Sequence, residues 1–154
     1  MEKTNAPGAG ILKVIGIVGL VLSGISGLMM SIAVLVDEQG GMGTPPMPTI
    51  YYLWAFALLC YCIYICIMAL INCKNLEKAE LLLTLGYINI GLGVVNAIVD
   101  IVLVGLAAVM MLPVAFAISI LYIVGAFKNK KMFDNQLSQQ RTSSTDSQCA
   151  IHNG

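Results

Sequence analysis

Three long apolar runs constrain this chain more than any other feature of its sequence. Residues 14–36 and 50–72 contain no Asp, Glu, Lys or Arg, and residues 81–127 contain a single charged residue, Asp100. A helix that crosses the hydrocarbon core of a membrane needs about 20 such residues. Backbone groups in lipid must form their hydrogen bonds within the segment, and strands rarely exceed about 10 residues. The runs therefore predict membrane-spanning helices.

The composition excludes two broad classes of protein. Apolar residues make up 58% of the 154 residues and charged residues 10%, whereas a soluble domain carries about 25% charged residues. The formal net charge is zero, which argues against a nucleic-acid binder with a basic surface. The first run is longer than the apolar core of a signal peptide, which has about 7–15 residues. We therefore expect it to be retained as a span.

The third run is long enough to cross a membrane twice. As one helix it would extend about 70 Å at a rise of about 1.5 Å per residue, against a hydrocarbon core of about 30 Å. We place a turn at Val104–Ala107, beside Gly105, and expect Pro113 to kink a helix rather than to end one. The predicted fold is an all-α integral membrane protein, a four-transmembrane-helix bundle. Its spans are residues 14–36, 50–72, 81–103 and 107–127.

The basic residues predict the orientation of the bundle. With four spans, every Lys and Arg falls on one side of the membrane, and short loops rich in these residues stay cytoplasmic. Both termini are therefore expected in the cytoplasm of a multi-pass protein, in the cell membrane. Residues 1–13 form a cytoplasmic N-terminal segment, residues 14–127 the transmembrane domain, and residues 128–154 a polar tail that we expect to be disordered. The basic residues are Lys3, Lys13, Lys74, Lys78, Lys128, Lys130, Lys131 and Arg141.

Two stripes of small or polar residues predict how the spans pack. In lipid, helices associate through close backbone approach and interhelical hydrogen bonds. The first span carries small residues at every fourth position, and the third carries small and polar residues at every third or fourth position. We expect the stripe of the third span to pack against small faces of the first and fourth spans. The first stripe is Gly19, Ser23, Gly27 and Ser31, and the second is Gly86, Asn89, Gly93, Asn96 and Asp100.

Asp100 is the one acidic residue within a predicted span, and ionisable residues inside a membrane are functional candidates. Together with Asn89 and Asn96 it could line a path for a cation, proton or substrate. The turn near Gly105 places it about one helical turn from the outer surface, where it could instead form interface or packing hydrogen bonds. We favour the second interpretation, and the sequence leaves both open.

The remaining residue types favour structural roles. Tyr51, Tyr52 and Trp54 are interpreted as anchors at the membrane interface, with a ligand-stacking platform as the alternative. Cysteines in the second span are expected to pack as small apolar residues, and juxtamembrane Cys73 is a candidate for palmitoylation. Methionines gather toward the outer side as gap-fillers, and a Cu(I) path is the alternative that their soft sulfurs allow.

The sequence shows no motif for catalysis or for a cofactor. His152 is the one histidine, which argues against a His-based metal site or a Ser/His/Asp triad. Walker, H-E-x-x-H and CxxC motifs do not occur in the sequence. We therefore expect a protein that is not an enzyme and that needs no cofactor or metal.

Four spans, cytoplasmic termini and short loops resemble tetraspan families such as the MARVEL-type and claudin-like proteins. The resemblance is one of topology, because the claudin-type W…GLW…C…C signature does not occur, and it transfers no residues. We expect a structural or regulatory interaction partner that acts through helix packing and self-associates. Its partners would be the bilayer and a second copy or another membrane protein, and not nucleic acid. The alternative is an oligomeric channel or transporter subunit with a polar pathway along the third helix.

Overall fold

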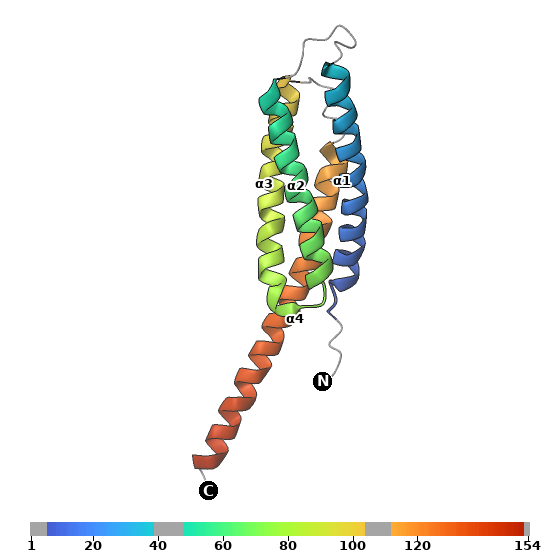
Figure 1. Cartoon of the computed structure of the whole chain (residues 1–154). Helices are drawn as coiled ribbons and strands as arrows, with labels where there is room; N and C mark the ends of the chain where they lie inside the picture. The colour runs from blue at the N-terminus through green and yellow to red at the C-terminus, as the bar shows by residue number, and fades with distance from the viewer. Residues whose placement is uncertain (1–5, 39–47, 104–111, 153–154) are drawn as a thin grey trace.

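The computed structural model describes residues 6–38, 48–103 and 112–152 (Figure 1). These ranges contain helices and no strand, which confirms the all-α prediction. Helices α1, α2 and the segment of η2 with α3 are each long and apolar enough to cross a membrane. The elements are α1 (Ala9–Glu38), α2 (Thr49–Asn72), the 3-10 helix η2 (Leu76–Lys78), α3 (Ala79–Leu103) and α4 (Leu112–His152).

The helix bounds agree best with the sequence where a run is bordered on both sides by polar or turn residues. Helix α2 begins one residue before the predicted span at 50 and ends at the predicted residue. Helix α3 is described up to Leu103, where the described part of the chain is interrupted. Helix α1 begins before the predicted start, because a helix can continue past its apolar run into the polar segment. The predicted turn at Val104–Ala107 and the predicted start of the fourth span lie outside the described residues.

The C-terminal segment differs from the sequence prediction, whereas the kink predicted at Pro113 is not tested. Pro113 is the second described residue of α4, and the residues before Leu112 lie outside the described part of the chain, so the kink stays a prediction. The structure continues α4 through residues 128–152, beyond the other helices (Figure 1). A helix without tertiary contacts is marginally stable in water, so disorder of this segment stays a prediction.

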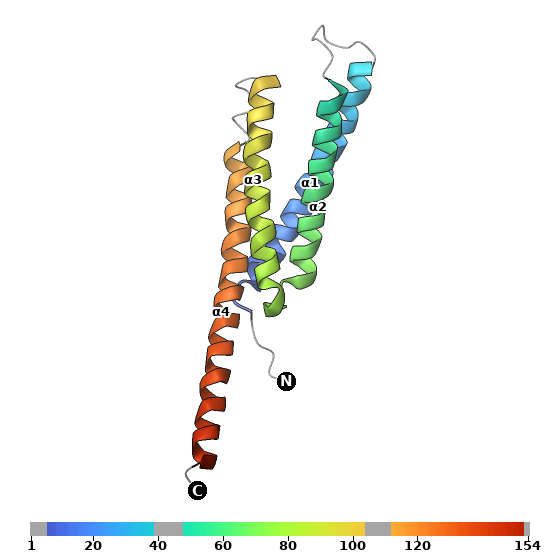
Figure 2. The ribbon, with the colours of Figure 1, turned by 90° about the vertical axis from the view of Figure 1, so that its left-hand side faces the viewer.

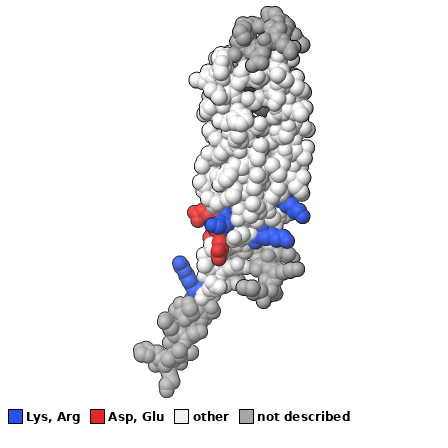
Figure 3. All heavy atoms as spheres, in the orientation of Figure 1, with Lys and Arg blue, Asp and Glu red and all other residues white. Residues whose placement is uncertain are grey.

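The helices form two hairpins, α1 with α2 and α3 with α4. Figure 2 shows the hairpins close together at one end and apart at the other. We call the first the basic end, because Lys13, Lys74, Lys78 and Lys128 lie there, and the other the distal end, where Val36, Thr49 and Leu103 lie. On the face drawn in Figure 3, charged side chains gather below the bundle's apolar body.

The hydrophobic core lies in the basic half of the bundle. Leu12 of α1 and Leu82 of α3 are fully buried, and α4 contributes Tyr122 and Ala126. Glycines allow the close approach of the helices: a Cβ on Gly125 of α4 would lie 3.1 Å from Leu12 Cγ. This half therefore has all four helices in contact. The other buried residues of the core are Ile15, Ile65, Ala69 and Cys73.

Asn129 connects three helices at the basic end of the bundle through hydrogen bonds of its side chain. Its side chain is fully buried, its Nδ2 donates to the carbonyl oxygen of Cys73 at 2.9 Å, and its Oδ1 accepts from the backbone N–H of Gly8 at 2.7 Å. One amide of α4 thus ties the start of α1 to the end of α2. The nearby Lys130–Glu80 pair, at 3.5 Å on the surface, contributes little by comparison.

Candidate functional site

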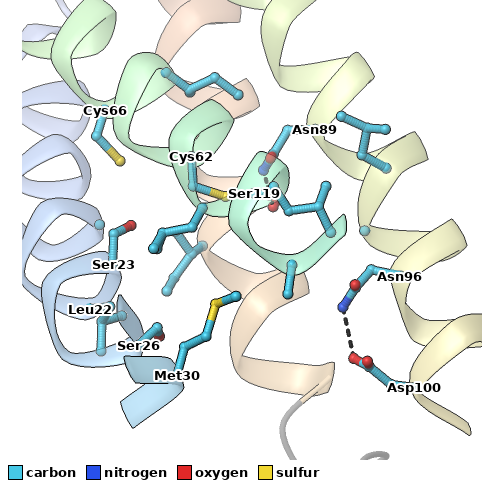
Figure 4. A pocket seen from close by; sticks show the side chains of 18 of the residues that line it. Leu22, Ser23, Ser26, Met30, Cys62, Cys66, Asn89, Asn96, Asp100 and Ser119 are labelled. Atoms are coloured by element: carbon cyan, nitrogen blue, oxygen red, sulfur yellow. Dashed lines mark hydrogen bonds between the residues drawn. The ribbon is translucent and has the colours of Figure 1, made fainter. Parts of the chain in front are cut away.

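A cavity of about 690 Å³ lies between the two hairpins, above the core. All four helices line it, and most of its walls are apolar (Figure 4). Ile15 and Tyr122 belong both to the core and to this lining, so the core closes the cavity toward the basic end. Met30 and Asp100 line the part toward the distal end. The cavity exists because the two hairpins diverge toward the distal end.

A chain of hydrogen bonds joins α2 to α3 at the distal end of the cavity. Asp100 accepts on both carboxylate oxygens, from Tyr51 Oη at 3.1 Å and from Asn96 Nδ2 at 2.7 Å. Asn96 Oδ1 in turn accepts from Trp54 Nε1 at 3.2 Å. A carboxylate has about four lone-pair sites, and these two bonds use about half of them. Asp100 therefore keeps acceptor capacity, and it lines the cavity.

A second polar pair links α3 to α4 farther along the same face of α3. Asn89 Nδ2 donates to Ser119 Oγ at 2.9 Å, and both residues line the cavity. From the facing side, α1 contributes Ser23 and Ser26 to the lining (Figure 4). The cavity is thus an apolar space with polar groups placed at separate heights rather than in one cluster.

Asp100 forms no salt bridge with a Lys or Arg side chain among the described residues. The described Lys and Arg residues lie at the basic end or on the part of α4 that extends past it. The two neutral donors on Asp100 stabilise its charge through hydrogen bonds without neutralising it. A charge within an apolar environment is costly when nothing neutralises it.

Tyr122 carries the one buried side-chain N or O atom that finds no hydrogen-bond partner in the described part of the chain. The residue is 4% exposed and lies where the core meets the cavity. An unsatisfied buried hydroxyl costs about 1–3 kcal/mol. The cavity floor therefore gives up stability that a fully apolar core would retain.

The structure brings the polar stripe predicted from the sequence into the cavity. Asn89, Asn96 and Asp100 line it, and so does Gly93, where an added Cβ would meet nothing within 4 Å. Asn96 and Asp100 bond to α2, whereas Gly86 and Asn89 face α4. The expected packing on the fourth span therefore holds for part of the stripe. The expected packing on the first span is wrong, because the hairpins diverge and α2 supplies the donors.

The small stripe of α1 faces α2 rather than α3. A Cβ on Gly19 would meet Cys66 Sγ, and a Cβ on Gly27 would lie 3.1 Å from Leu59 Cδ2. Ser31 is exposed, and its Oγ donates to the carbonyl oxygen of Gly27 in the same helix at 2.9 Å. Close packing within one hairpin uses much of this stripe. On α3, a Cβ on Gly86 would lie 2.7 Å from Ile123 Cγ1, so this glycine lies against α4.

Cys73 is 6% exposed, and its Sγ donates to the carbonyl oxygen of Leu70 at 3.3 Å. Acylation requires an accessible thiol, so this placement argues against the predicted lipidation. Cys62 and Cys66 line the cavity, and all four described cysteines are free thiols. Within the described residues, no three His, Cys, Asp or Glu side chains gather as a metal site.

Two sets of contacts at these sites are not anticipated by the sequence. The sequence alone favours Tyr51 and Trp54 as interface anchors, yet they donate to the polar stripe. Their spacing of three places them on one helix face, and this signal could suggest a shared partner. Asn129 lies within a Lys-rich segment that is typical of a solvated helix end, and nothing in the sequence marks it as buried.

Comparisons with models of known families, with curated proteins and with solved structures gave no match.

Proposed function

We propose that this chain is a multi-pass protein of the cell membrane with four spans and cytoplasmic termini, and that it acts as a structural or regulatory interaction partner. Three helices have the length and composition of membrane spans. The apolar part of α4, up to Phe127, runs beside them. Basic residues gather at one end of the bundle, in agreement with the positive-inside rule.

The observation that carries this proposal is the closed core of the basic half. Leu12, Leu82 and Asn129 are fully buried there, and the cavity ends above them. A path along α3 would have to pass this core. Since Asn96 and Asp100 bond to α2 of the same chain, they are also not free to line a pore between subunits. This arrangement favours binding over conduction.

Self-association would use the face of α1 that turns away from α2. Gly24 has open space where a Cβ would lie, and Ser31, one heptad later, is exposed. Ile17 and Leu28, on the same side, are 48% and 65% exposed. Small residues between larger ones allow a second helix to approach closely in lipid. We define these four residues as the outer face of α1.

Crosslinking of the full-length protein in native membranes tests the association. We expect Gly24→Leu to reduce the crosslinked dimer by about tenfold while the monomer stays folded. Gly27→Leu is the contrasting variant, because it would collide with Leu59 and destabilise the hairpin itself. Only monomers in the wild type, or an unchanged dimer in Gly24→Leu, would refute self-association through this face.

The cytoplasmic position of both ends has its own test. Accessibility labelling of single cysteines, introduced at Lys74 and at Lys128 in a cysteine-free background, should mark both positions from the cytoplasm. Labelling of the two positions from opposite sides would contradict an even number of spans.

A channel or transporter subunit is the second candidate, and one observation favours it. Asn89, Asn96 and Asp100 line a cavity rather than facing lipid. Transport would require the closed core to open. Flux into liposomes that contain the protein should then fall in Asp100→Asn, and an unchanged flux would remove this acid from any pathway.

A further inference from the structure

We propose that the cavity between the hairpins binds a cationic amphiphile, a molecule with one ammonium group and a hydrocarbon chain. The ammonium group lies at Asp100, and the chain occupies the apolar space between the hairpins. This site goes beyond the interaction role proposed above, because it needs neither a second copy nor a partner protein.

The charge of Asp100 selects the head of the ligand. Both its oxygens accept from neutral donors, Tyr51 and Asn96, so part of the acceptor capacity of a carboxylate stays unused. Among the described residues it has no salt-bridge partner. An ammonium group would neutralise this charge and could donate to the unused lone pairs.

Aromatic rings border the same end of the cavity. Tyr51 and Tyr52 both line it, and their ring centroids are 6.0 Å apart in an edge-to-face arrangement. The faces of aromatic rings attract cations, and recognition of quaternary ammonium groups often depends on such rings. Tyr51, which donates to Asp100, therefore also supplies, together with Tyr52, an aromatic surface that favours a cation over a neutral head.

The distribution of basic residues argues against a phospholipid as the ligand. A zwitterionic headgroup would bring a phosphate beside the carboxylate, and a phosphate needs cationic or strong hydrogen-bond donors. The described Lys and Arg residues lie toward the opposite end (Figure 3). A head with one positive charge and no phosphate fits this surrounding best.

The rest of the cavity suits a hydrocarbon chain. Its volume of about 690 Å³ falls within the range of about 300–1,000 Å³ that is usual for small-molecule sites. Leu22, Met30 and Leu59 line it with Ile90 and Phe116. The polar pair in its middle, Asn89 and Ser119, is bonded to itself and does not demand a polar ligand group.

Trp54 provides a built-in reporter, because it is the one tryptophan of the chain and bonds to Asn96 beside Asp100. The full-length protein is placed in nanodiscs of phosphatidylcholine, so that a zwitterionic lipid is always in excess. The probe is a primary ammonium with a brominated alkyl chain. Its N–H groups can donate to Asp100, and its bromine quenches tryptophan on contact. Its control has the same brominated chain and a hydroxyl head, and both are compared at equal concentration in the bilayer.

We expect the ammonium probe to quench Trp54 at a concentration at least tenfold lower than the hydroxyl probe. Asp100→Asn should abolish this difference without changing quenching by the hydroxyl probe. Equal quenching by the two probes in the wild type would overturn the proposal, since phosphatidylcholine or nothing specific would then fill the cavity. An ammonium preference that survives in Asp100→Asn would overturn it as well.

Two glycines of α3 give a second test that leaves the carboxylate in place. A Cβ would meet nothing within 4 Å at Gly93 or at Gly91, but Gly93 lines the cavity and Gly91 does not. Gly93→Leu should lower the affinity for the ammonium probe by about tenfold, and Gly91→Leu should leave it unchanged. Equal effects in the two variants, with unchanged helicity by circular dichroism, would refute binding in the cavity.

Discussion

The two halves of the bundle treat buried polar groups in opposite ways. In the basic half, Asn129 uses both ends of its amide to join α1 and α2, and the surrounding side chains leave no space. In the distal half, Asp100 and Asn96 bond toward α2 and face a cavity on another side. The first arrangement holds helices together, and the second leaves a charge without a counter-ion.

This difference distinguishes polar groups that stabilise the fold from polar groups that are left available for binding. A polar group that serves stability alone is best satisfied completely, because a half-satisfied network is worse than an apolar core. Departures from that rule tend to mark functional sites. Asp100 and the open space at Gly93 lie on the cavity in the distal half, and the unpartnered hydroxyl of Tyr122 lies at the boundary where the core of the basic half meets it. These departures favour the cavity, rather than the core below it, as the place for the proposed ligand.

Among the substitutions that test this difference between the two halves, we expect the largest loss of stability at Gly8. A Cβ there would collide with the carbonyl oxygen of Gly125, which is backbone and cannot rotate away. We expect Gly8→Val to lower the free energy of unfolding by about 3 kcal/mol, in the upper range for overpacking. Unfolding would be measured by titration with sodium dodecyl sulfate in mixed micelles.

The matched control for Gly8→Val is Gly10→Val. Gly10 is exposed, and a Cβ added to it would meet nothing within 4 Å. The same side chain should therefore change the free energy of unfolding by less than about 1 kcal/mol there, because it displaces no neighbour and helix propensity slightly favours Val over Gly. Equal destabilisation in the two variants would mean that the start of α1 is not packed against α4.

The second effect in size is expected at Asn129. Asn129→Ala removes the partners of the Gly8 N–H and of the Cys73 carbonyl oxygen. Each group left unpaired in a buried site costs about 1–3 kcal/mol, so we expect a loss of about 2 kcal/mol if water reaches one of them. Asn135→Ala, on the exposed part of the same helix, should change unfolding by less than about 0.5 kcal/mol. A similar effect of the two substitutions would mean that the hydrogen bonds of Asn129 do not hold the helices together at the basic end.

Sequence reasoning succeeds where one physical constraint determines the outcome. The thickness of a bilayer sets the length of a charge-free run, so the apolar segments and the bounds of α2 are predictable. The spacing of Asn89, Asn96 and Asp100 likewise places them on one face, because the helical period is regular.

Pairing between helices is not predictable in the same way. A stripe such as Gly19 and Gly27 indicates that some helix approaches closely, but every neighbouring span is apolar and none is distinguished as the partner. The burial of Asn129 depends on where α4 crosses the start of α1, which no local pattern encodes. Tyr51 is equally ambiguous, because an interface anchor and a donor to a buried acid have the same sequence signature.

The smallest effect, and the sharpest test of the distal half, is expected at Tyr51. Tyr51→Phe removes the hydroxyl that donates to Asp100 Oδ1 and keeps the ring. Hydrogen bonds between membrane helices contribute about 0.6 kcal/mol on average, so stability should fall by about that amount. Tyr64→Phe, on the exposed side of α2, is the control and should have no measurable effect. In a double-mutant cycle with Asp100→Ala, which removes both acceptor oxygens, the two changes should show a coupling energy of similar size. Strict additivity would mean that the hydrogen bond from Tyr51 to Asp100 does not contribute to stability. Asp100 would then not be held by α2 on one side while it faces the cavity on the other.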